Sequence, residues 1–111
     1  MKSDDRAYLE DMLESARRAI SYIDGVSAAD FDRDLKTQDA VIYRIGIVGE
    51  AARHVSAETC GELELDWMAI RSMRHRLFHG YRELRLDIVW TTVDNDLPQL
   101  VRDLEQFLGL A

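Results

Sequence analysis

Proline, glycine and cysteine are all scarce in this chain of 111 residues. One proline and six glycines are too few for the many turns of an all-β protein, so long helices are favoured over short strands. The single cysteine, Cys60, excludes an internal disulfide and cannot form a thiolate metal site by itself. Apolar residues make up 47% of the chain and charged residues 32%, which is typical of one folded domain and predicts a single unit over residues 1–111.

Long apolar runs are also missing. The first residues, MKSDDRAYLEDMLE, are charged from the start and do not resemble a signal peptide. The apolar stretches AVIY and IGIVG are interrupted by Arg44 and Glu50 and are far shorter than a membrane span. We therefore expect a cytoplasmic protein with no membrane partner.

Positive charge is scarce except in one segment. The formal net charge is −7, which disfavours a general binder of nucleic acid or anionic lipid. Residues 71–85, RSMRHRLFHGYRELR, nevertheless hold five arginines, two of the three histidines and only one carboxylate. With five positive charges and one negative charge, this segment carries about +4 and the remainder about −11. A polyanion would have to bind at this segment.

Apolar residues recur at helical spacing through most of the chain. The pattern predicts long helices over residues 4–23, 37–55, 66–78 and 87–108, and a short helix after Ser27. Pro98 must kink the last helix or begin a new helical piece. Gly46 and Gly49 weaken the central helix, and we expect them to permit close approach of another helix backbone. The predicted fold is an all-α bundle of four long helices plus a short one.

Arg74 is the anomaly in this pattern. On a helical wheel Ile70, Met73 and Leu77 define a buried arc, and Arg74 falls beside them. A guanidinium there is costly unless it is paired or faces a cleft or a partner chain. An ordinary solvated face that pairs with the acidic remainder would explain Arg76 and Arg85, but it explains Arg74 poorly.

The histidines allow two chemistries. His75 and His79 have the spacing of a metal-binding pair, but the glutamate of the zinc-protease motif is absent and cations flank both, so no metal and no cofactor is expected. Histidine moves protons near neutral pH, and arginine holds phosphate oxygens. Together they suit cleavage of RNA, in which the 2′-hydroxyl attacks the neighbouring phosphate. The same residues would also suit a phosphate-binding site without catalysis.

Three segments resemble the HepT-like toxins of the HEPN superfamily. Arg74-x4-His79-x-Tyr81 matches the signature R-x(4–6)-H-x-Y of that family. The stretch AVIYRIGIVGEAARHVS is similar to its central helix with the GEA element, and DWMAIRSMRHRLFHGY to its motif segment. DIVWTTVDNDLPQL resembles the segment that follows. The ordered set is far more specific than the short motif alone.

This resemblance implies a fold and a function. The expected fold is a HEPN bundle that forms a homodimer, with the motif segments of both subunits at one cleft. The expected activity is that of a metal-independent endoribonuclease acting as a toxin, with RNA as substrate and a minimal nucleotidyltransferase of the MntA type as antitoxin. Arg74 and His79 would be catalytic. Tyr81 would receive AMP from the antitoxin, and the additional phosphate-binding candidates are Arg71, His75 and Arg82.

Two positions depart from the family pattern. The family commonly has asparagine or a small polar residue where this chain has His75, which would either hydrogen-bond within the cleft or join the proton transfers. Arg44 stands where relatives often carry a polar residue. The alternative function is a non-catalytic helical dimer that docks onto a nucleotidyltransferase.

Overall fold

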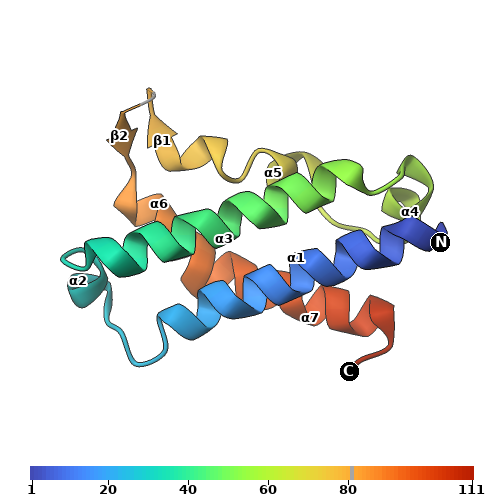
Figure 1. Cartoon of the computed structure of the whole chain (residues 1–111), viewed down its shortest axis with the longest axis horizontal. Helices are drawn as coiled ribbons and strands as arrows, with labels where there is room; N and C mark the ends of the chain where they lie inside the picture. The colour runs from blue at the N-terminus through green and yellow to red at the C-terminus, as the bar shows by residue number, and fades with distance from the viewer. Residues whose placement is uncertain (81) are drawn as a thin grey trace.

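Helices dominate the structure, which confirms the predicted all-α class. The computed structural model describes residues 1–80 and 82–111 (Figure 1). Its longest helices are α1 (Ser3–Tyr22) and α3 (Leu35–His54), of 20 residues each. They pack side by side and are connected through the short helix α2 (Ala28–Phe31). Two further short helices, α4 (Ala57–Glu62) and α5 (Trp67–Arg71), follow α3.

The C-terminal part of the chain is helical from Leu86 onwards. It consists of α6 (Leu86–Thr91), one π-helical turn η2 (Thr92–Asp96) and α7 (Leu97–Leu108). Pro98 lies in the first turn of α7, directly after the π-helical turn, because proline has no amide hydrogen to continue the regular ladder. Of the two predicted alternatives, a kink or a new helical piece, the structure shows the second, since α7 begins at Leu97. Among the described residues, no helix is both long and apolar enough to cross a bilayer.

Side-chain caps set the beginnings of four helices. Each capping oxygen accepts a hydrogen bond from the backbone N–H three residues later, which satisfies a donor that has no partner within the helix. The capping residues are Ser27, Asp34, Ser56 and Asp66. The short helix predicted after Ser27 is confirmed as α2.

The hydrophobic core lies where α1, α3 and α7 meet. Leu9 and Met12 of α1, Ile45 and Val48 of α3 and Leu104 of α7 have no exposed surface. These side chains occupy one face of each helix, so the three helices bury their apolar stripes against one another. Another face of α3 contacts α5, where the arginine-rich segment begins.

Helix α5 lies unusually close to α3 at Gly49. An ideal Cβ on Gly49 would lie 3.1 Å from the carbonyl oxygen of Ile70 and 3.5 Å from that of Arg71. The expected close approach of a neighbouring backbone is therefore confirmed at Gly49. At Gly46 the prediction is wrong, because the nearest neighbour there is the side chain of Arg74, not a backbone.

Substituting Gly49 with alanine should destabilise the fold. The added methyl group meets backbone carbonyls, which cannot rotate away, so α5 must shift; we expect the free energy of unfolding to fall by about 1–3 kcal/mol. The control is Gly61→Ala in α4, where a Cβ meets nothing within 4 Å. There the better helix propensity of alanine should leave stability unchanged or raise it by up to about 1 kcal/mol. Urea unfolding followed by circular dichroism measures both, and equal stability of the two variants would contradict the close approach.

A buried carboxylate connects the start of α1 with the start of α4. Asp5 in the first turn of α1 is 2% exposed and accepts hydrogen bonds from three donors at the start of α4. These are the hydroxyl of Ser56, the hydroxyl of Thr59 at 2.6 Å and the backbone N–H of Ser56 at 3.0 Å. The hydroxyl of Ser56, followed by that of Thr59, lowers the pKa of Asp5 from 3.8 to about 2. The ionised form is thus favoured by the folded state.

Acid should weaken the fold through Asp5. Because the folded-state pKa is depressed, the stabilising contribution is complete above the unfolded pKa of 3.8 and is lost as the pH falls toward about 2. In Asp5→Asn this part of the pH dependence should disappear, and the variant should be less stable at neutral pH. The matched control is Asp4→Asn, which removes a charge from an exposed neighbour in the same turn. Thermal unfolding between pH 2 and pH 7 measures the effect, and identical profiles for the two variants would refute it.

Candidate active site

The arginine-rich segment is not one continuous helix. The predicted helix over residues 66–78 is wrong beyond Arg71, where α5 ends. A turn follows, then the 3-10 helix η1 (His75–Leu77) and a hairpin of β1 (Phe78–His79) and β2 (Glu83–Leu84). The hydroxyl of Ser72 donates to the carbonyls of Met68 and Ala69, an interaction that competes with continued helix. The predicted burial of Ile70, Met73 and Leu77 is nevertheless confirmed.

The side chain of Arg74 lies against α3, beside Gly46. Its Cδ would be 3.1 Å from a Cβ on Gly46, and its guanidinium carbon lies 5.6 Å from the centre of the Phe78 ring. The side chain is exposed and makes no hydrogen bond or ion pair with any residue that the structure describes. A guanidinium held by apolar contacts alone keeps all its donors available for an anion.

Two hollows adjoin Arg74, one on each side. We call the first the arginine hollow; it is lined by Gly46, Gly49, Glu50, Arg53, Arg71, Arg74 and His75. The second, the apolar hollow, is lined by Asp39, Ile42, Tyr43, Gly46, Ile47 and Arg74. Three arginines and one imidazole surround the arginine hollow against a single carboxylate. This arrangement suits a phosphate group, because converging cations offer both charge and directed donors.

Arg71 faces the arginine hollow but is held by the scaffold. Its Nε donates to the carbonyl of Ala52 at 3.3 Å, and its Nη2 lies 3.2 Å from the sulfur of Cys60. The guanidinium carbon also lies 5.6 Å from the ring centre of Trp67. Arg71 therefore contributes charge to the hollow while several of its donors are already used. Its predicted phosphate-binding role stays a prediction.

The two histidines of the motif lie in different places. His75 lines the arginine hollow beside Arg74, and its ring makes no hydrogen bond with the described part of the chain. His79 is exposed on β1, opposite Glu83 in the hairpin, and lines neither hollow. Arg82 is exposed between the strands. The structure thus gathers Arg71, Arg74 and His75 and leaves His79 and Arg82 on the hairpin.

Glycine makes the hairpin turn possible. Gly80 has a φ of 69°, a left-handed conformation that is strained for other residues. Leu77 accepts a hydrogen bond from the backbone of Arg85 at 2.6 Å, which closes the hairpin at its base. The predicted modification site, Tyr81, lies outside the described residues.

Arg53 and Glu50 also line the arginine hollow, although they were not predicted as site residues. They lie on α3, on the same face as Gly46 and Gly49, and Arg53 donates to the carbonyl of Arg71 at 3.4 Å. Glu50 lies 3.9 Å from Arg53 and 3.5 Å from the Nε2 of His54. A helical wheel places positions 46, 49, 50 and 53 on one face, and that spacing was the signal that could have revealed this wall.

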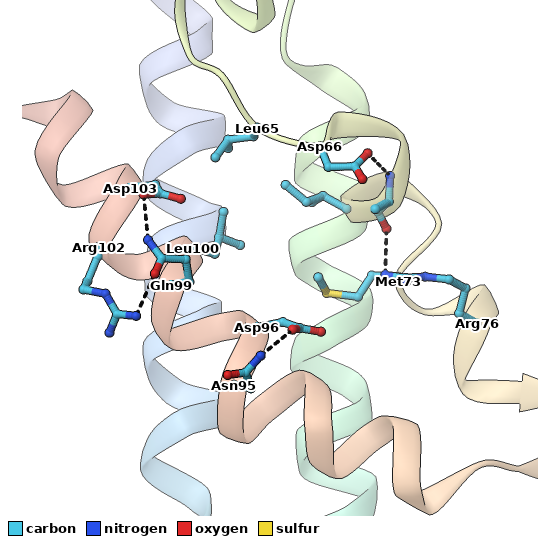
Figure 2. A pocket seen from close by; sticks show the side chains of 12 residues that line it. Leu65, Asp66, Met73, Arg76, Asn95, Asp96, Gln99, Leu100, Arg102 and Asp103 are labelled. Carbon is cyan, nitrogen blue, oxygen red and sulfur yellow. Dashed lines mark hydrogen bonds between the residues drawn. The ribbon is translucent and has the colours of Figure 1, made fainter.

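The arginines expected to be ordinary surface residues are confirmed as exposed. Arg85 pairs with Asp87 at 3.2 Å, and Arg76 donates to the carbonyl of Ala69 at 3.3 Å. Arg76 also lines a larger hollow between α5 and the η2–α7 region (Figure 2). Figure 2 shows Asp66 and Met73 on one wall and Gln99 and Asp103 on the other. This hollow shares no lining residue with the two that adjoin Arg74.

The described residues contain no cluster of three or more histidine, cysteine or carboxylate side chains placed to hold a metal ion.

Arg44 is the other position that departs from the expected family pattern. Its guanidinium carbon lies 5.1 Å from the ring centre of Tyr43, and its Nε is buried without a hydrogen-bond partner in the described chain.

Fold and site together define an all-α protein that presents Arg74, which has no ion pair among residues 1–80 and 82–111, at a hollow on its central helix. Comparison with known proteins assigns the chain to a family within this class. It belongs to the HepT-like ribonucleases, since the model of the family described as Ribonuclease HepT-like matches residues 12–107.

Relatives of similar length support this assignment. A candidate ribonuclease HepT from Thermococcus cleftensis is 32% identical over 96% of this chain and 97% of its own length. A candidate RNase from Methanocaldococcus jannaschii is 29% identical over 96% of this chain and 89% of its own length. A candidate RNase from Caldanaerobacter subterraneus subsp. tengcongensis is 29% identical over 93% of both chains. No solved structure matches the chain significantly.

Proposed function

We propose that this protein is a metal-independent endoribonuclease and the toxin of a toxin–antitoxin pair in the cytoplasm. The observation that carries the proposal is the exposed guanidinium of Arg74, which has no ion pair among the described residues and adjoins a hollow with two further arginines and an imidazole. A purely structural arginine on an acidic protein would be expected to have a carboxylate partner. Membership in a family of ribonucleases makes RNA the expected anion.

The proposed chemistry uses the 2′-hydroxyl of RNA as nucleophile. A base removes its proton, the oxygen attacks the adjacent phosphorus, and the 5′-oxygen of the next nucleotide leaves with a proton, which yields a 2′,3′-cyclic phosphate. His79 acts as base or acid in these transfers, as imidazole can near neutral pH. Arg74 binds the scissile phosphate and stabilises the charge that builds on its oxygens. Arg71, His75 and Arg82 hold flanking phosphates.

A homodimer would complete this site. Beside Arg74, the apolar hollow gathers Ile42, Tyr43 and Ile47 of α3, and Tyr43 is 60% exposed; such apolar surface favours association with a second copy. Two arginine hollows facing one cleft would focus a positive potential there, although the net charge of each chain is −7. A cleft of this kind binds RNA locally while the exterior stays acidic.

The expected antitoxin is a minimal nucleotidyltransferase that adds AMP to Tyr81. Gly80 and Arg82, the described residues that flank position 81, are exposed, so another protein can contact these two residues. An added AMP brings a negative phosphate and a bulky nucleoside close to the motif. Both would oppose RNA binding, the phosphate through like-charge repulsion.

Removing either catalytic side chain should abolish cleavage. Arg74→Ala and His79→Ala should each lower the rate of RNA cleavage in the presence of EDTA by about 100-fold or more, since each supplies charge stabilisation or proton transfer in the transition state. Arg85→Ala, which removes an exposed arginine paired with Asp87, should cleave at the wild-type rate. The loss of fluorescence quenching in a labelled RNA measures the rates, and an active His79→Ala variant would refute the assigned mechanism.

Modification by the antitoxin should occur on Tyr81. Co-expression with the nucleotidyltransferase should increase the intact mass of the protein in steps of one AMP, and Tyr81→Phe should remove this increase. Tyr43→Phe, which alters an exposed tyrosine on α3, should still be modified. AMP attachment to a protein that cleaves no RNA at any concentration would instead support the alternative function, a non-catalytic dimer that docks onto the nucleotidyltransferase.

A further inference from the structure

Gly46 has no backbone reason to be glycine. It lies within α3, and the glycines with a positive φ are Gly25, Gly80 and Gly109. Alanine would be the better helix former at a regular helical position. The reason for glycine at this position is therefore the lack of room for a side chain beside its neighbours.

The neighbour of Gly46 is the stem of Arg74. An ideal Cβ on Gly46 would lie 3.1 Å from the Cδ of Arg74 and 3.6 Å from its Nε. Ordinary van der Waals contacts begin at 3.4 Å, so the arginine stem lies directly on the bare helix backbone. Gly49, one turn later on the same helix, has backbone atoms of Ile70 and Arg71 as its nearest neighbours. The contact at Gly46 is thus specific to the Arg74 side chain.

Few other contacts determine where the Arg74 guanidinium lies. The Phe78 ring, 5.6 Å from the guanidinium carbon, limits it on one side, and the described residues include no carboxylate paired with it. Gly46 and Arg74 line both the arginine hollow and the apolar hollow, so the stem crosses α3 at the boundary between the two. A methyl group at position 46 would push the stem outward by a few tenths of an ångström and shift the guanidinium with it.

We propose that Gly46 is a positioning residue. Because it has no side chain, the stem of Arg74 packs directly against the backbone of α3, and this contact places the guanidinium where it can bind the scissile phosphate. The inference rests on the proposed ribonuclease function. Gly46 does not itself touch RNA in this scheme and acts only through Arg74. Because Arg74 is a flexible and exposed side chain, it can yield to a methyl group, and the fold should tolerate alanine.

The test combines Gly46→Ala with Arg74→Ala. Gly46→Ala alone should unfold at the wild-type temperature or higher, while kcat for RNA cleavage falls about 10-fold or more and KM changes less, since small misplacements of a catalytic group are costly. Its affinity for a 2′-O-methyl RNA oligonucleotide, which cannot be cleaved by 2′-attack, should also fall. In the Arg74→Ala background, Gly46→Ala should cause no further loss of affinity. Gly61→Ala, in open space on α4, is the control and should cleave and bind RNA as the wild type does.

The outcomes separate the positioning role from the function itself. An active wild type with an equally active Gly46→Ala variant would overturn the positioning role and leave the ribonuclease function standing. An equal loss of affinity in both backgrounds would overturn it too, because Gly46 would then act independently of Arg74. If Gly46→Ala is destabilised, the same destabilisation in the Arg74→Ala background would also overturn it. A wild type that cleaves no RNA would overturn both proposals.

Discussion

The close seating of α5 on α3 is the contact on which the candidate site depends. Gly49 brings the backbone of α3 within van der Waals reach of the carbonyl oxygens of Ile70 and Arg71. The next residues of the chain therefore leave α5 directly above α3, and Arg74 reaches across it at Gly46. A bulkier residue at position 49 would raise α5 and carry the whole arginine segment with it. The packing of α5 on α3 thus determines where the arginine side chains of this segment lie.

Arginines with the same chemistry have different tasks in this segment. Arg71 is held by the carbonyl of Ala52 and the sulfur of Cys60, whereas Arg74 makes no such polar contact within the described chain. An arginine with satisfied donors stabilises the fold, and one with available donors can bind a phosphate. Neither nearby carboxylate neutralises Arg74 among the described residues. Glu50 at the arginine hollow lies close to Arg53 and His54 instead, and Asp39 at the apolar hollow makes no ion pair with Arg74.

The secondary structure of the motif shows where prediction from sequence failed. The apolar residues Ile70, Met73 and Leu77 are spaced by three and four, which is typical of an α-helix but fits a turn followed by a 3-10 helix as well. Side-chain bonds from Ser72 and the left-handed Gly80 favour the interrupted path. The burial of these three residues was therefore predicted correctly although the predicted secondary structure was wrong, because a continuous α-helix and the observed turn with a 3-10 helix both direct the same side chains into the core.

The all-α class, the short helix after Ser27 and the resemblance that singled out Arg74 and His79 could be predicted from the sequence, because they depend on local spacing and on short motifs. Which arginines have their donors engaged by the fold, and which residues of α3 face them, follows from tertiary packing. The partners of Arg71 lie 19 and 11 positions away along the chain, and Gly46 of α3 meets Arg74 from the turn that follows α5. Such contacts arise from packing between distant segments, and no local pattern of residues specifies them.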